Sequence, residues 1–132
     1  MYSYSMQVRD YECDLQGVVN NAVYQNYLEH ARHQFLLHIG VDFPALTAQG
    51  IHLMVIRAEL DYKDSLLPGD EFEVAVQLNR ASRIKYLFEQ EIRRKFDDKV
   101  MLRAVFTGVA LNQKKRPFAF ELFEKNINAQ TD

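Results

Sequence analysis

A single carboxylate in a polar turn offers the clearest site for chemistry in this 132-residue sequence. Asp14 lies three residues before Gly17, and the chain then runs through Asn20 into a helical pattern. A turn of the form Asp-x-x-Gly aims its aspartate and leads directly to the free N–H groups of a helix start. This layout places a nucleophile or general base beside donors that can bind a developing oxyanion. A purely structural type I turn would use the same residues.

Two backbone groups near this turn could complete the chemistry. Gly17 has no Cβ, so a ligand can approach its main chain closely. The N–H groups near Gly17 and Asn21 would bind a carbonyl oxygen, because a helix start carries partial positive charge. Glu29, about two turns into the helix, is the second candidate acid. An exposed helical glutamate without a function is the alternative interpretation of Glu29.

A long helix that follows the turn in the sequence must hold the turn in position. Apolar residues recur there at helical spacing: Tyr24, Leu28, Ala31, Phe35 and Ile39. Further apolar side chains widen the stripe, which predicts a mostly buried helix over residues 22–39. Asn20 or Asn21 suits the N-cap, and Gly40 suits the left-handed position after the helix.

Alternating apolar and polar residues predict a strand before the turn, over residues 2–8, and four strands after Gly50. The four later strands cover about residues 53–62, 72–78, 84–93 and 100–111, and residues 118–127 favour a short closing helix. Short connections imply antiparallel neighbours. We therefore expect one α+β domain over residues 1–132, with a five-stranded antiparallel sheet wrapped around one long central helix.

Composition limits the classes of partner. The chain is 48% hydrophobic and 26% charged, which is typical of a soluble globular protein, and its net charge is −2. That charge gives no reason to expect nucleic acid or an anionic membrane as a partner. No apolar run is long enough to span a bilayer, and the N-terminus lacks the pattern of a secretory signal. We therefore expect a cytoplasmic protein.

Cys13 is the only cysteine, so no internal disulfide can form. It has no local histidine or basic partner to activate it, which favours a small buried neighbour of Asp14 over a nucleophile. The four histidines and Cys13 show no metal-ligand spacing, and we expect neither a metal nor a cofactor.

The motif Gln-Val-x4-Cys-Asp-x2-Gly-Val-Val-Asn over residues 7–20, placed ahead of the helix, resembles the hotdog fold. More narrowly, it is similar to the 4-hydroxybenzoyl-CoA thioesterase family of acyl-CoA thioesterases. Leu-Asp-Tyr at residues 60–62 and Pro-Gly-Asp-Glu at residues 68–71 also resemble that family's pattern. Many relatives carry a histidine after the glycine, and this chain has none there.

The resemblance implies hydrolysis of an acyl-CoA thioester to a free acid and CoA, with Asp14 as nucleophile or general base. Gly17 and Asn21 would supply the oxyanion donors. Arg83 and Lys85 resemble the site where relatives grip CoA phosphates, against the alternative of a solvated strand end. The basic run at residues 114–116 has the same two interpretations.

Relatives of this kind assemble as homodimers or homotetramers with active sites between subunits. Three other functions fit the same fold: acyl-ACP hydrolysis, hydratase or dehydratase chemistry, and non-catalytic acyl-CoA binding. Hydratases usually pair the acid with a nearby histidine, and none follows Asp14 before His30.

Overall fold

The computed structural model describes residues 1–130, which form one antiparallel sheet, three α-helices and one 3₁₀ helix. In chain order the elements are β1 (Tyr2–Gln7), η1 (Asp10–Glu12), α1 (Asn21–His38), α2 (Phe43–Ala48), β2 (His52–Tyr62), β3 (Glu71–Arg80), β4 (Tyr86–Arg94), β5 (Lys99–Leu111), β6 (Pro117–Phe118) and α3 (Glu121–Gln130). The strand order is β1-β3-β4-β5-β2, and the short β6 pairs with β5. All pairings are antiparallel, so the expected five-stranded sheet is confirmed and β6 is an addition.

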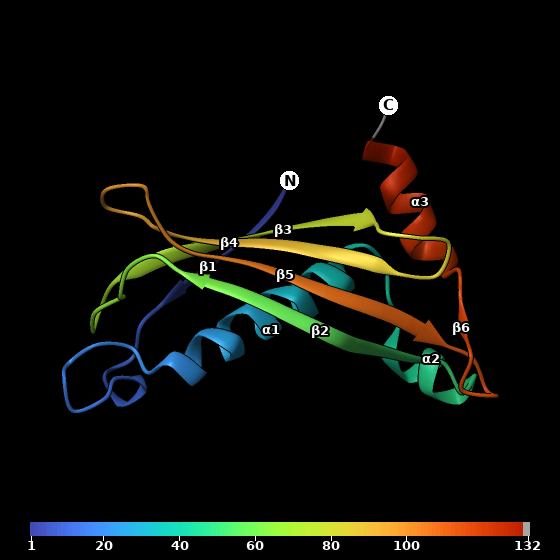
Figure 1. The fold of residues 1–132 in the computed structure, drawn as a ribbon, viewed down its shortest axis with the longest axis horizontal. Helices are drawn as coiled ribbons and strands as arrows, with labels where there is room; N and C mark the ends of the chain where they lie inside the picture. Colours follow the sequence, from blue (N-terminus) through green and yellow to red (C-terminus); the bar gives the residue numbers. More distant parts are fainter. Residues whose placement is uncertain (131–132) are drawn as a thin grey trace.

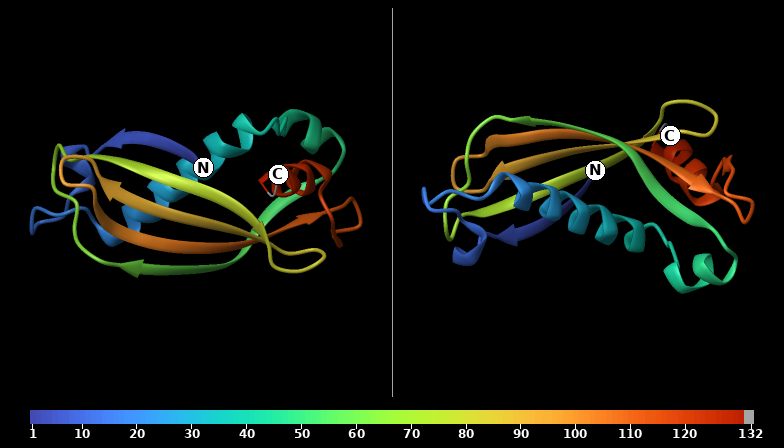
Figure 2. Two further views of the ribbon diagram at one scale, coloured as in Figure 1. Left: turned by 90° about the horizontal axis from the view of Figure 1, so that it is seen from above. Right: turned by 60° about the horizontal axis from the view of Figure 1, so that its bottom comes forward.

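α1 lies against one face of the sheet and runs across it (Figure 1; Figure 2). The opposite face has no helix over it and presents alternate polar side chains to solvent, as antiparallel sheets commonly do. The turn that holds Asp14 lies at one end of the molecule, and α3 lies at the other (Figure 1). No helix within residues 1–130 combines the length and the apolar character needed to cross a membrane.

Local signals determine the ends of α1. Asn20 is the N-cap, and its side chain accepts a hydrogen bond from the N–H of Ala22. Gly40 follows the C-cap with φ of +98°, the left-handed position predicted for it. The buried residues of α1 are Tyr24, Tyr27, Leu28, Ala31 and Phe35. The expectation of a mostly buried helix is wrong, because the sheet covers one face of α1 and the other face is exposed.

Aromatic contacts hold the core together between α1 and the inner face of the sheet. The rings of Tyr27 and Phe72 lie 4.7 Å apart, and those of Phe35 and Phe88 meet edge to face at 6.4 Å. α3 closes the far end, with the ring of Phe123 at 5.7 Å from Phe88. The predicted closing helix is therefore present, shifted toward the C-terminus.

β2 departs from its sequence pattern. It is an edge strand that pairs only with β5, and its register shifts between Val55 and Arg57. Met54, Val55 and Ile56 are consequently all exposed, at 49%, 46% and 52%. Simple alternation does not describe this strand, and it presents a row of apolar side chains beside an unpaired backbone edge.

Candidate active site

The Asp14 turn is a small loop closed by its own hydrogen bonds. A β-bridge joins Cys13 to Val19 at its base. The N–H of Asp14 donates to the carbonyl of Val18 at 2.9 Å, and the N–H of Gly17 donates to the carbonyl of Asp14 at 3.0 Å. Gly17 adopts a φ of +75°, which glycine tolerates without strain. The loop therefore carries its own backbone support.

The same turn orients the Asp14 carboxylate. Its Oδ1 accepts hydrogen bonds from the N–H of Gln16 at 2.9 Å and from the N–H of Val18 at 3.5 Å. Its Oδ2 has no hydrogen-bond partner within the part of the chain that the structure describes. One oxygen is thus held and the other is free to act on a substrate or a water molecule.

The start of α1 supplies one unused backbone donor. The Asn20 side chain occupies the N–H of Ala22, and its carbonyl accepts from Val23. The N–H of Asn21 has no partner in residues 1–130, whereas that of Gly17 is used inside the turn. Of the two donors expected from the sequence, Asn21 is the one available in this conformation.

Glu12 and Tyr27 anchor the approach to this turn. The Tyr27 hydroxyl donates a 2.8 Å hydrogen bond to Oε1 of Glu12, which also accepts from the N–H of Arg9 at 2.8 Å. Burial and then this bond raise the pKa of Tyr27, so the hydroxyl stays a donor. Sequence reasoning missed this pair, although a tyrosine on a buried helical stripe signals a hydroxyl that needs a partner.

A second set of bonds ties the turn to the segment after β2. The N–H of Val19 donates to the carbonyl of Leu66 at 3.0 Å, and the N–H of Leu66 donates to the Tyr24 hydroxyl oxygen at 2.8 Å. The Tyr62 hydroxyl donates to the carbonyl of Asn21 at 3.3 Å. The turn is therefore tied to the segment after β2, and the helix start is tied to the end of β2 itself.

Asp14 lies at the surface of the chain beside exposed apolar residues. Leu15 at the tip of the turn is 107% exposed, and Tyr11 is 75% exposed. Cys13 does not compete as a nucleophile, because desolvation and then the neighbouring Asp14 charge raise the pKa of its thiol. The candidate acid therefore stands next to apolar surface that is not covered within one chain.

An apolar cavity of about 440 Å³ lies between α1, β2 and β5. Its walls include Leu36, Leu53, Met54, Phe88 and Phe106. Glu29 and Arg32 contribute the charged groups on its α1 side. The structure thus places Glu29 on the cavity wall, about two turns of α1 beyond its first residue, Asn21. A cavity of this size and character suits an acyl group.

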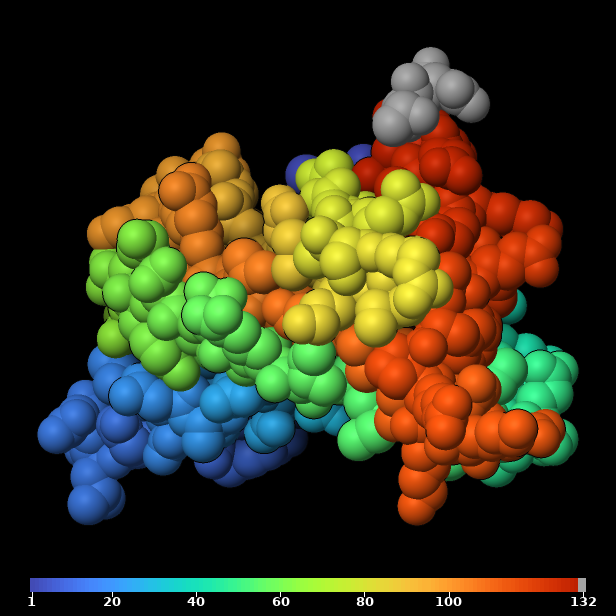
Figure 3. Space-filling model, turned by 45° about the vertical axis from the view of Figure 1, so that its right-hand side comes forward, coloured from blue at the N-terminus to red at the C-terminus, as the bar shows by residue number. Residues whose placement is uncertain are grey.

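Arg83 and Lys85 lie in the turn between β3 and β4 rather than in a strand, and both are exposed. Their turn is at the opposite end of the chain from Asp14 (Figure 1). The basic residues 114–116 occupy another turn at that same end (Figure 3). One chain therefore holds Asp14 and Asn21 at the same end of the molecule, in a turn and the helix start that follows it, and leaves the expected phosphate-binding residues at the opposite end.

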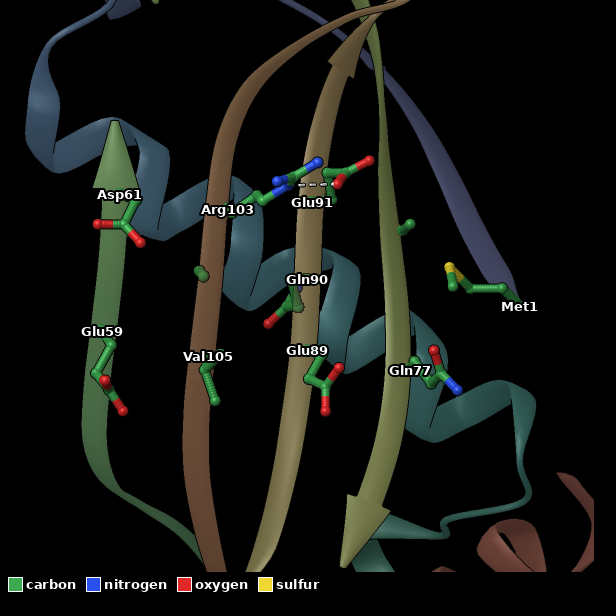
Figure 4. A pocket seen from close by; sticks show the side chains of 11 residues that line it. Met1, Glu59, Asp61, Gln77, Glu89, Gln90, Glu91, Arg103 and Val105 are labelled. Carbon is green, nitrogen blue, oxygen red and sulfur yellow. Dashed lines mark hydrogen bonds and ion pairs between the residues drawn. The ribbon is translucent and has the colours of Figure 1, made fainter. Parts of the chain in front are cut away.

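A second hollow of about 350 Å³ lies on the helix-free face of the sheet (Figure 4). Its rim carries the acidic residues Glu59, Asp61, Glu89 and Glu91, and Arg103 pairs with Glu91 at 2.9 Å. Four carboxylates on its rim make this hollow a poorer match for an acyl chain than the cavity beside α1. Within residues 1–130, no cluster of three or more histidine, cysteine or acidic side chains could hold a metal ion.

Solved structures share this architecture. A hypothetical protein from Aquifex aeolicus superposes with a TM-score of 0.84 and 26% identity, over 96% of this chain and 99% of that one. A long helix packed on one face of an antiparallel sheet is the hotdog arrangement, so the fold expected from the sequence resemblance is confirmed. The chain belongs to the Thioesterase-like superfamily, whose family model matches residues 8–129.

Two relatives of known name show how far the similarity extends. The acyl-acyl carrier protein thioesterase ATL3 of Arabidopsis thaliana is 36% identical over 112 residues, which cover 85% of this chain and 59% of that protein. The long-chain acyl-CoA thioesterase FadM of Escherichia coli is 28% identical over 123 residues, 91% of this chain and 92% of that protein. The match thus spans less than two thirds of the plant relative.

Proposed function

We propose that this chain is an acyl-CoA thioesterase in which Asp14 attacks the thioester carbonyl or activates water. The observation that carries the proposal is the Asp14 carboxylate, with Oδ1 held by the turn and Oδ2 free, in a turn that leads into the unused N–H of Asn21 at the helix start. The family, the apolar cavity and the apolar surface around the turn support a thioester substrate with an acyl chain.

Both routes through Asp14 are chemically complete. As a general base, Oδ2 takes a proton from water while the water oxygen bonds to the carbonyl carbon. The resulting oxyanion accepts a hydrogen bond from Asn21, and its collapse breaks the C–S bond. The departing CoA sulfur then receives the proton from Asp14. As a nucleophile, Asp14 forms a mixed anhydride and releases CoA, and water then hydrolyses the anhydride.

An acyl carrier protein as the acyl donor is the second candidate. The similarity to ATL3 favours it, and so do the exposed cations of the two turns at the end opposite Asp14. Such a surface would attract an acidic carrier protein. Comparing the kcat/KM of the same acyl group on CoA and on a carrier protein decides between the two, since a large preference for the carrier would replace CoA as the substrate.

We also propose that the chain functions as a homodimer paired through β2, or as a homotetramer of such dimers. The unpaired edge of β2 and its exposed Met54, Val55 and Ile56 support this pairing. A two-fold axis between antiparallel β2 strands would reverse the direction of the second subunit. The turn with Arg83 and Lys85 of one subunit would then lie toward the Asp14 end of its partner. In this arrangement Asp14 of one subunit and the expected phosphate-binding residues of the other would belong to the same site.

The test is thiol release from short, long and aromatic acyl-CoAs by wild type and by Asp14→Asn. Asparagine keeps the turn but removes the charge, so kcat should fall by about 10²–10⁴ while the fold survives. Asp10→Asn is the matched control, because Asp10 lies outside the turn and should change kcat little. A folded Asp14→Asn protein with near wild-type activity would remove Asp14 from the mechanism. Binding without hydrolysis by wild type would indicate an acyl-CoA-binding protein.

A further inference from the structure

Arg32 of α1 places a guanidinium group on the wall of the apolar cavity. Its Cζ lies 4.0 Å from the centre of the Phe106 ring, and its Nη1 donates a 3.0 Å hydrogen bond to Oε1 of Gln90. No carboxylate among residues 1–130 forms an ion pair with it. Burial, opposed only by the charge of Glu29, lowers the pKa of Arg32. A cation without a counter-ion on an apolar cavity wall lowers the stability of the fold unless an anion binds it.

Gln90 holds this guanidinium in one orientation. It is the only buried polar or charged side chain that the structure shows in residues 1–130, at 4% exposure. It lies on β4 where that strand passes over α1 (Figure 4). Its Nε2 donates a 2.9 Å hydrogen bond to the carbonyl of Leu28, which leaves its Oε1 facing Arg32. The helix backbone therefore fixes the amide, and the amide fixes the guanidinium.

The other edge of the guanidinium, formed by Nε and Nη2, remains available. Neither nitrogen has a hydrogen-bond partner in the described chain. Neither is sealed in protein, since no buried side-chain nitrogen or oxygen of the described residues lacks a partner. Arg32 thus offers two parallel N–H donors inside a largely apolar cavity of about 440 Å³. This fork matches the two oxygens of a carboxylate.

We propose that Arg32 selects acyl groups with a carboxylate at the end remote from the thioester, as in mono-thioesters of dicarboxylic acids. The inference rests on the proposed thioesterase function and names the acyl class for the same site. Within one chain, Arg32 lies roughly 16 Å along α1 from Asn21, so it cannot also bind the reacting carbonyl there. The apolar walls between would enclose the methylene chain, and the charged end would meet the Nε–Nη2 edge.

The kinetic test compares suberoyl-CoA with octanoyl-CoA, and dodecanedioyl-CoA with dodecanoyl-CoA. Wild type should favour the dicarboxylic member of at least one pair by about 10- to 100-fold in kcat/KM, because two charge-assisted hydrogen bonds are at stake. Arg32→Met should abolish this preference by slowing the dicarboxylic substrate and sparing the plain one. Arg32→Lys keeps the charge but loses the two parallel donors, so its preference for the dicarboxylic substrate should lie between those of wild type and Arg32→Met. Arg103→Met is the control, because Arg103 lies on the opposite face of β5.

A binding measurement separates this inference from the proposed function. Non-hydrolysable thioether analogues of the same CoA derivatives are titrated by calorimetry into wild type and Arg32→Met. If the dicarboxylic analogues bind more tightly through Arg32 but the corresponding thioesters are not hydrolysed, the thioesterase function is wrong and the Arg32 site stands. A wild type that shows no preference, or a preference that survives Arg32→Met, would overturn the Arg32 site. A wild type without a preference is the result expected if a carboxylate of a partner subunit already binds the Nε–Nη2 edge of Arg32.

Discussion

The hydroxyl of Tyr27 donates a 2.8 Å hydrogen bond to Oε1 of Glu12, which joins the buried face of α1 to the segment that enters the Asp14 turn. Tyr27→Phe removes this donor and leaves a half-buried carboxylate with less support. We expect a loss of about 1–3 kcal/mol in the free energy of unfolding, because the acceptor is charged. Urea denaturation measures this difference.

Tyr2→Phe is the control for that measurement, since the Tyr2 hydroxyl makes no hydrogen bond in the described residues and should contribute little. Equal stability of the two variants would show that the Tyr27–Glu12 bond does not support the fold. If the bond also positions the turn, Tyr27→Phe should lower kcat modestly as well.

Gly17 and Gly40 form a matched pair for testing close approach of the substrate. Both have positive φ, +75° and +98°, and a Cβ added to either would meet no atom within 4 Å. Gly17→Ala and Gly40→Ala should therefore lose similar stability, about 1–2 kcal/mol each, from backbone strain alone. Only Gly17→Ala should also lower kcat/KM, because only that Cβ would lie where the thioester approaches Asp14. Equal kcat/KM in the two variants would assign Gly17 a purely conformational role.

Features that depend on residues close together in the sequence were predictable. Asn20 as N-cap, Gly40 after the helix and the alternation of β1 and β3 all depend on short-range chemistry, and these predictions are confirmed. The motif over residues 7–20 identified the turn for the same reason.

Contacts between distant segments were not predictable. The Arg32–Gln90 bond joins residues 58 positions apart, and the pattern of α1 alone gives no sign that a cation enters the cavity. The bulge near Ile56 breaks the alternation of β2, so the exposure of that strand could not be read from its residues. Arg83 and Lys85 lie in a turn and not at the start of a strand, because β3 runs on to Arg80 and β4 begins only at Tyr86.

Arg83 and Lys85 should contribute to binding of the CoA phosphates and not to the chemical step. Replacing both with Ala should raise KM and leave kcat nearly unchanged, since the lost contacts are equal in the ground state and transition state. Replacing Lys114 and Lys115 with Ala removes the same charge from the other basic turn and tests whether that turn shares the phosphate contacts. A fall in kcat at constant KM would show that Arg83 and Lys85 are misassigned.

Pairing through β2 predicts a particle of at least twice the 15.5 kDa chain mass by light scattering at micromolar concentration. Ile56→Lys should shift the protein toward the monomer, because it places a charge on the apolar edge. Phe96→Lys, at the exposed tip of the β4–β5 turn, should leave the mass unchanged. A wild-type mass of one chain would exclude the dimer.

The self-contained bonding of residues 13–19 has a consequence for how such a protein can diverge. The turn depends on its own backbone, on Leu66 and on two tyrosines of α1, whereas the cavity is formed by separate residues, mainly of α1, β2 and β5. Substitutions at well-separated sites act nearly independently. Leu53 and Phe106 can therefore be varied to change which acyl group fits while the reacting carboxylate keeps its place. The residues that carry the reaction and those that select the acyl group are therefore different, and the cavity can be the target of directed evolution.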